Sequence, residues 1–180
     1  LAAFRSEVEG LKERGVKISP SNLFISDRAT IILPLHQSLD ELRESNNLIK
    51  IGTTKRGIGP AYEDKVGRRA IRLCDLFDKN KLNKKIEILL NHHNAIMRGF
   101  GYKEYNLEDV VDDIYKLGEF AKPFSKTIND ITNVINSGKE KVLFEGAQGF
   151  LLDIDHGTYP FVTSSNVHAS YASIGSGLSP

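Results

Sequence analysis

A short glycine-rich segment in the first third of the chain carries the residue types that bind phosphate. Residues 52–60 read Gly-Thr-Thr-Lys-Arg-Gly-Ile-Gly-Pro. The glycines let a backbone approach a ligand closely, the threonines supply hydroxyl donors, and the lysine and arginine supply positive charge. The Walker A pattern Gly-x-x-x-x-Gly-Lys-Ser/Thr occurs nowhere in the sequence. The segment therefore predicts either a phosphate-binding loop of another type or a simple turn.

Basic residues continue beyond this loop at helical spacing. Residues 50–72 include seven Lys or Arg and two acidic residues, a local charge of +5, whereas the whole chain carries +1. Such cations could hold a phosphomonoester, contact a nucleic-acid backbone or form a solvated helix face. The low net charge and the single aromatic residue of this region, Tyr62, argue against a nucleic-acid binder. Four of the cations follow Pro60, and pairs of them are three or four residues apart, which places several on one helix face: Lys65, Arg68, Arg69 and Arg72.

A second polar loop follows the apolar segment 141–145. It begins with Gly-Ala-Gln-Gly at 146–149 and extends to Asn166, with hydroxyl side chains at 163–165. Gln148, between two glycines, could present its amide to a purine base edge or to a carbonyl oxygen. A turn held by carboxylate-to-backbone hydrogen bonds explains the other polar residues more simply than a metal site does: Asp153, Asp155 and His156.

The elements that must position these loops alternate between helix and short strand. Apolar residues at helical spacing predict helices over residues 1–15, through 39–42, and over 60–69, 79–97, 106–123 and 128–138. Short apolar or β-branched runs predict strands at 23–26, 30–33, 48–53 and 141–145. We therefore expect an α/β fold with a largely parallel sheet flanked by helices, in which ligands gather at the carboxyl ends of the strands.

Length and composition narrow the class of protein further. A chain of 180 residues with 40% hydrophobic content can bury one sizeable core, as one domain or as part of a larger one. Cys74 is the single cysteine, which excludes an internal disulfide and fits a cytoplasmic setting. No apolar run approaches the roughly 20 residues of a membrane-spanning helix, so we expect no membrane contact. The isolated histidines are assigned no role: His36, His92, His93 and His168.

Two long motifs resemble, in the same order, those of one enzyme family. Residues 57–68, Gly-Ile-Gly-Pro-Ala-Tyr-Glu-Asp-Lys-Val-Gly-Arg, resemble the second signature of adenylosuccinate synthetase. Residues 144–166, which contain Phe-Glu-Gly-Ala-Gln-Gly, Asp-Ile-Asp and Gly-Thr-Tyr-Pro-Phe-Val-Thr-Ser-Ser-Asn, are similar to a later stretch of the same enzymes. The resemblance makes residues 1–180 the central fragment of a larger, P-loop-like single domain, with N-terminal and C-terminal parts outside it. Residues 167–171, Val-His-Ala-Ser-Tyr, depart from the family pattern.

The resemblance implies a C–N bond-forming ligase of AMP biosynthesis. Enzymes of this family join IMP and L-aspartate with consumption of GTP to give adenylosuccinate, GDP and phosphate. By similarity, Thr54 and Thr163 would bind the 5′-phosphate of IMP, and Arg68 would reach it from the other subunit of a homodimer. Gln148 would bind IMP at its 6-oxygen and stabilise the developing oxyanion. Lys65 matches a signature lysine, for which a catalytic role, helix packing and electrostatic support all remain open.

The same resemblance places the Mg²⁺ site, the catalytic base and the acid before Leu1, and the guanine-reading residues after Pro180. We therefore expect no metal ligand within the chain, and no activity from these residues alone. Two alternatives remain: a nucleic-acid or polyphosphate binder that uses the cations of residues 50–72, and a structural fragment or degenerate homologue whose motifs persist without a competent site.

Overall fold

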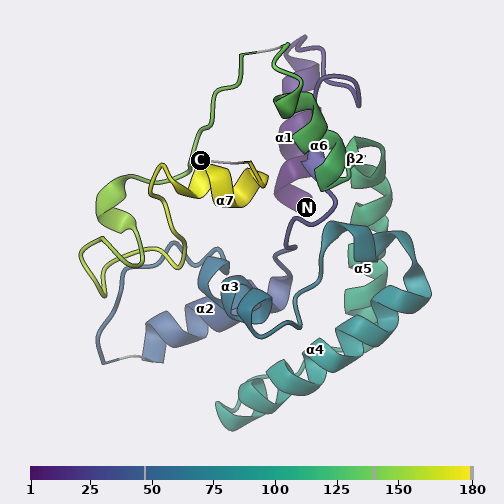
Figure 1. Cartoon of the computed structure of the whole chain (residues 1–180). Helices are drawn as coiled ribbons and strands as arrows, with labels where there is room; N and C mark the ends of the chain where they lie inside the picture. The colour runs from purple at the N-terminus through teal and green to yellow at the C-terminus, as the bar shows by residue number, and fades with distance from the viewer. Residues whose placement is uncertain (47, 140, 179–180) are drawn as a thin grey trace.

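The computed structural model describes residues 1–46, 48–139 and 141–178, and these residues are mostly helical (Figure 1). The α-helices are α1 (Ala2–Glu13), α2 (Pro34–Asn46), α3 (Ile58–Val66), α4 (Lys79–Gly99), α5 (Leu107–Ala121), α6 (Ile128–Asn136) and α7 (Tyr171–Ser176). Short 3-10 helices lie at η1 (Leu73–Phe77), η2 (Lys122–Phe124) and η3 (Phe150–Leu152). Strands β1 (Ile25–Ser26) and β2 (Ser125–Lys126) pair in parallel, with Ile25 opposite Ser125.

Side-chain caps fix where several helices begin. Asp78 accepts hydrogen bonds from the amides of Asn80 and Lys81 at the start of α4. Asn106 accepts from the amide of Asp109 at the start of α5. Each cap satisfies amides that have no partner inside the first turn of a helix.

The main hydrophobic core lies between α4, α5 and η1. Buried side chains come from all three elements and from residues 31–35, with aromatic side chains of α1 and α5 packed around them. α2 and α3 contact one another, and the loops of residues 142–168 lie at the same side of the molecule as these two helices (Figure 1). The core thus holds the helices that carry the polar loops.

The largely parallel sheet expected from the sequence is reduced here to the β1–β2 pair. Among the described residues, segment 30–33 makes one antiparallel bridge, from Thr30 to Arg72. Segments 48–53 and 141–145 contain no strand pairing, and Leu143 is 88% exposed. Apolar and β-branched residues mark a segment that suits a sheet, but they do not supply the neighbouring strand that its backbone needs. No helix in the described part of the chain is long and apolar enough to cross a membrane.

Candidate functional site

One cleft brings together residues that the sequence analysis singled out in separate motifs. Thr54 from the first loop lines this cleft together with Gln148 and Thr163 from the second, although the two loops are far apart in the sequence. The cleft has a volume of about 240 Å³, and its wall also includes Thr53 and Ser164. Hydroxyl and amide groups from both loops therefore face one space.

Two buried carboxylates of α2 hold the first loop at its ends. Glu44 Oε1 accepts the amide of Gly52 at 2.7 Å, and Asp40 Oδ2 accepts the amide of Gly57 at 2.9 Å. Both carboxylates are 8% exposed. The loop between these contacts is thereby fixed against α2, with Thr54 exposed toward the cleft.

The first turn of α3 completes this side of the cleft. Gly57 precedes the helix with φ +78°, and a Cβ there would lie 2.8 Å from the backbone of His36, so only glycine allows α2 and α3 to approach this closely. Among the described residues no side chain accepts a hydrogen bond from the amides of Ile58 and Gly59, and both residues line the cleft. Free amides at a helix N-terminus attract anions. The hydroxyl of Thr53 is buried without a hydrogen-bond partner among the described residues, which leaves a further polar group at the same place.

A fully buried carboxylate organises the second loop. Asp153 Oδ1 accepts the amides of Asp155 and His156 at 2.9 and 3.1 Å, and Asp153 Oδ2 accepts those of Val167 and His168 at 2.6 and 3.2 Å. Burial alone would raise the pKa of Asp153, but these backbone hydrogen bonds outweigh it and hold that pKa well below its usual range. The expectation of a turn held by carboxylate-to-backbone bonds is confirmed for Asp153.

The same contacts account for the stretch that departs from the family pattern. The amides of Val167 and His168 are fixed by Asp153, and α7 begins at Tyr171. Residues 163–165 lie between the two amide pairs, and the hydroxyls of Thr163 and Ser165 are 3.3 Å apart. The atypical side chains of residues 167–171 therefore leave this backbone anchorage in place.

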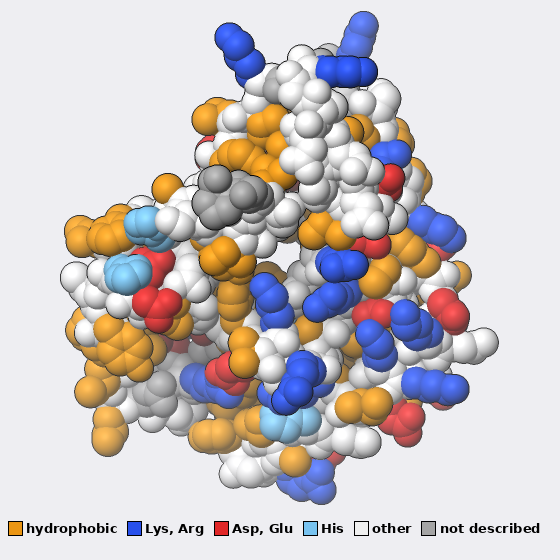
Figure 2. All heavy atoms as spheres, in the orientation of Figure 1, with side chains coloured by type: hydrophobic (Ala, Val, Ile, Leu, Met, Phe, Trp, Pro, Cys, Tyr) orange, Lys and Arg blue, Asp and Glu red, His pale blue; other side chains and the backbone are white. Residues whose placement is uncertain are grey.

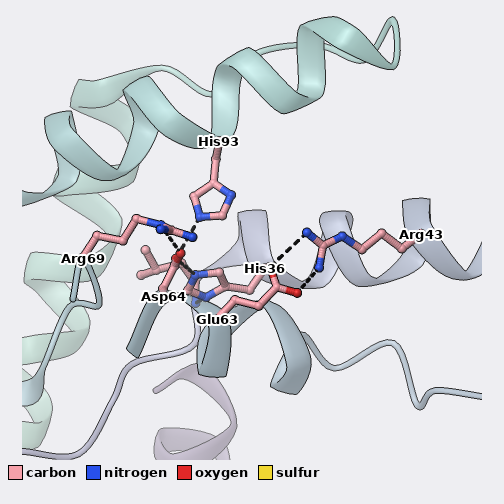
Figure 3. A network of polar contacts seen from close by, with 7 residues as sticks. His36, Arg43, Glu63, Asp64, Arg69 and His93 are labelled. Carbon is pink, nitrogen blue, oxygen red and sulfur yellow. Dashed lines mark hydrogen bonds and ion pairs between the residues drawn. The ribbon is translucent and has the colours of Figure 1, made fainter. Parts of the chain in front are cut away.

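A second buried carboxylate, Asp64 of α3, joins three helices (Figure 3). Asp64 Oδ2 lies 2.8 Å from Nε2 of His36 on α2 and 2.8 Å from Nε2 of His93 on α4. Arg69 Nε donates to Asp64 Oδ1 at 2.5 Å. Burial alone would raise the pKa of Asp64, but the hydrogen bonds from His36 and His93 lower it well below its usual range.

His36, Asp64 and His93 come close enough to resemble a metal site, but their hydrogen bonds oppose this function. The amide of Leu33 donates to Nδ1 of His36 at 3.0 Å, so the proton of a neutral His36 is on Nε2. A metal would require the lone pair of that nitrogen. Arg69 adds a positive charge beside Asp64, and Mg²⁺ prefers oxygen ligands. The cluster therefore does not fit Mg²⁺. Its geometry is that of a buried carboxylate that links several side chains through hydrogen bonds and an ion pair.

Lys65 and Arg68 do not line the cleft that contains Thr54. Lys65 lines a separate cavity of about 570 Å³ with Arg28 and Arg72, and its Nζ lies 5.4 Å from the centre of the Tyr62 ring. Figure 2 shows Lys and Arg side chains gathered beside a hollow between α3 and α7. Arg68 is exposed and has φ +60°.

Sequence reasoning missed the buried polar residues that hold the cleft together. His36, Asp40 and Glu44 are four residues apart on α2, among the buried leucines of the same helix. Polar residues at this spacing share one helix face, so a polar stripe within an apolar face was the available signal. The partners Asp64 and His93 carry no comparable local signal.

Comparison with known proteins identifies the fold. A family model described as adenylosuccinate synthetase matches residues 1–180. A solved structure, the fully ligated adenylosuccinate synthetase from Plasmodium falciparum, superposes with a TM-score of 0.83 at 32% sequence identity, covering 97% of this chain and 41% of that one. The fold is therefore that of part of an adenylosuccinate synthetase. Because the family model matches the whole chain, the chain belongs to the adenylosuccinate synthetase family.

A relative from Wolbachia pipientis wMel, named adenylosuccinate synthetase, is 52% identical over 182 residues. The match covers 98% of this chain and 42% of the relative. The chain thus spans about two fifths of the length of the proteins that it matches.

Proposed function

We propose that this chain is the IMP-binding central segment of an enzyme that joins IMP and L-aspartate with consumption of GTP. The observation that carries the proposal is the shared cleft of Thr54, Gln148 and Thr163. Membership of the family supports the reaction, and three of the four residues that the resemblance assigns to IMP line this cleft.

The phosphate end of IMP binds, in this proposal, at the N-terminus of α3. Thr54 and Thr163 donate hydroxyl hydrogen bonds to the 5′-phosphate, and the uncapped amides of Ile58 and Gly59 lie on the same wall of the cleft. The orphaned hydroxyl of Thr53 gains a partner when an anion is bound. Arg68 of a second subunit adds its guanidinium, which accounts for its exposure and its place outside the chain's own cleft.

Gln148 is the residue of this chain closest to the proposed chemistry. The 6-oxygen of hypoxanthine is a poor leaving group, and transfer of the GTP γ-phosphoryl group to it prepares displacement by the aspartate amine. The amide of Gln148 donates to the 6-oxygen as negative charge develops there. Lys65 gives electrostatic support from the neighbouring cavity. Following the resemblance, we place Mg²⁺ and most GTP contacts outside these residues; the described cluster of His36, Asp64 and His93 does not fit the metal.

The exposed apolar segments around Leu48 and Leu143 suggest which strands a larger sheet would contain. We propose that residues 48–53 and 141–145 are strands of a larger, largely parallel, P-loop-like sheet, of which residues 1–180 form the central part. Their exposed Leu48 and Leu143 support this, as does the greater length of the relatives. Slow hydrogen exchange of the Leu143 amide in the full-length protein tests it; fast exchange there contradicts it.

Calorimetric titration of the full-length protein with IMP, inosine and ribose 5-phosphate tests the binding proposal. We expect IMP to bind more tightly than inosine or ribose 5-phosphate, because the cleft contacts both the phosphate and the base. Thr163→Val should weaken IMP binding by about tenfold and leave inosine binding unchanged, because one hydrogen bond to a charged group is lost. Thr158→Val, in the same loop but outside the cleft wall, is the matched control.

Steady-state kinetics separate the roles of the remaining residues. Arg68→Ala should mainly raise the KM for IMP, and Gln148→Ala should lower kcat more than it weakens IMP binding. Binding that falls steeply with salt and does not distinguish IMP from ribose phosphate would instead indicate a polyphosphate binder.

A further inference from the structure

Arg68 adopts a left-handed backbone conformation that residues with a side chain rarely adopt. Its φ of +60° occurs two residues after the end of α3. The amide of Arg68 donates to the carbonyl of Lys65 and that of Arg69 donates to the carbonyl of Asp64, as in a Schellman motif. Glycine is the usual residue at the left-handed position of this motif, yet the only glycine here, Gly67, stands one residue earlier.

Gly67 stands where the side chain of Arg69 crosses the end of the helix. A Cβ on Gly67 would lie 3.0 Å from Cζ of Arg69 and equally close to the carbonyl oxygen of Glu63. Because that Cβ is missing, the guanidinium passes over the last turn and reaches Asp64 (Figure 3). Gly67 thus leaves room for the side chain of Arg69, and the left-handed position is occupied by Arg68.

Asp64 cannot shift to follow Arg69, because it is held from two other helices. His36 of α2 and His93 of α4 both contact Asp64 Oδ2. Arg69 is therefore drawn inward, and the adjacent Arg68 is directed to the surface. No described residue forms an ion pair with Arg68, so its guanidinium remains available.

We infer that Asp64 and Arg69 are positioning residues that hold the turn after α3 and thereby present the Arg68 guanidinium to a second subunit. This inference rests on the proposed function, in which Arg68 binds the IMP phosphate in the partner's cleft. Neither residue lines the cleft that contains Thr54. It acts by fixing the direction in which Arg68 leaves the backbone.

A double-mutant cycle on KM in the full-length enzyme tests the inference. Arg69→Gln, at a side chain that is 23% exposed, removes the contact with Asp64 without emptying the core. We expect the KM for IMP to rise about tenfold with less than about a twofold change in kcat. In an Arg68→Ala background the same substitution should change KM by less than about twofold, because there is no guanidinium left to misplace. Arg69→Lys keeps a charge near Asp64 and should restore most of the affinity.

Asp75→Asn provides a matched control. Asp75 is also a buried carboxylate, held by Lys85 at 2.7 Å and by the amide of Arg72 at 3.0 Å, but it lies on η1. Its effect on KM should be the same with and without Arg68. If the KM increases caused by Arg69→Gln and by Arg68→Ala multiply in the double variant, the positioning role is refuted while the role of Arg68 stands. If Arg68→Ala alone leaves KM unchanged, the proposed role of Arg68 fails and the inference fails with it.

Discussion

Asp64 and Asp153 are both excluded from solvent and both organise a wall of the cleft, but their hydrogen-bond donors differ in kind. Asp64 accepts from side chains on three different segments: His36, His93 and Arg69. Asp153 accepts from four backbone amides within residues 155–168. The first carboxylate ties separate helices together, and the second folds one loop around itself.

The difference determines how each region responds to mutation. The contacts of Asp64 can be removed one at a time, because each donor is a side chain with its own residue. The contacts of Asp153 cannot, since every residue other than proline supplies the same amide. Sequence change in residues 155–168 is therefore tolerated around Asp153, as the atypical residues 167–171 show. Sequence change around Asp64 alters the joint between α2, α3 and α4.

The largest effect is expected from Asp153→Ala. This substitution leaves four amides without their acceptor, so the loop opens locally even where the helices stay folded. Hydrogen exchange at the amides of His156 and Val167 should accelerate roughly 1,000-fold. Asp155→Ala is the control, because Asp155 is exposed and its one side-chain partner is Asn166. Equal acceleration in both variants would remove the special role given to Asp153.

Asp64→Asn should have the next largest effect. The amide group keeps one acceptor oxygen but places an N–H donor opposite a side chain that already donates, so the buried network loses one acceptor and its negative charge. We expect the free energy of unfolding to fall by about 3 kcal/mol, as measured by denaturant titration. Asp112→Asn removes an exposed ion pair with Lys79 and should leave the free energy of unfolding nearly unchanged, because solvent screens such a pair. Matching losses in the two variants would mean that Asp64 is not a structural joint.

Acid titration measures the share of stability that belongs to Asp64. Its pKa is lowered by folding, so its contribution is complete above the unfolded-state pKa of about 4 and is lost as the pH falls through the folded-state pKa. Between pH 5 and pH 2 the decline in unfolding free energy should be smaller in Asp64→Asn than in the parent, by about 2 kcal/mol. The remaining decline includes Asp153, whose pKa is also lowered. An unchanged decline would show that Asp64 titrates alike in both states.

The sequence predicted helices at α1 to α6 because their signals are local, but it did not predict the short α7. Apolar spacing located α4 and α5. Strands 48–53 and 141–145 were predicted from the same kind of pattern, but sheet formation depends on a neighbour that local pattern does not specify.

The loop residues of the candidate site were predictable from the sequence, but the buried polar residues that hold these loops in place were not. Thr54, Gln148 and Thr163 stand in motifs whose residue types indicate ligand contact, and the structure brings them to one cleft. His36 and His93 were assigned no role, because their partner Asp64 lies on another helix and a contact between helices depends on the folded arrangement. Asp40 and Glu44 were missed although their spacing on α2 was a local signal, because their partners are backbone amides of the first loop, which nearly every residue type supplies.

The smallest expected effect is the difference in stability between Arg68→Gly and Arg68→Ala. This pair separates the contribution of the turn to stability from the contribution of the guanidinium to IMP binding. Glycine adopts φ +60° without steric cost, whereas arginine pays about 1 kcal/mol for it, so the variant should gain up to about 1 kcal/mol of unfolding free energy over Arg68→Ala. Both variants lack the guanidinium and should share the same raised KM for IMP. Denaturant titration and steady-state kinetics on the pair make the comparison direct. A native arginine at a position that favours glycine is consistent with a side chain retained for binding, and equal stability of the two variants would show that the turn carries no such strain.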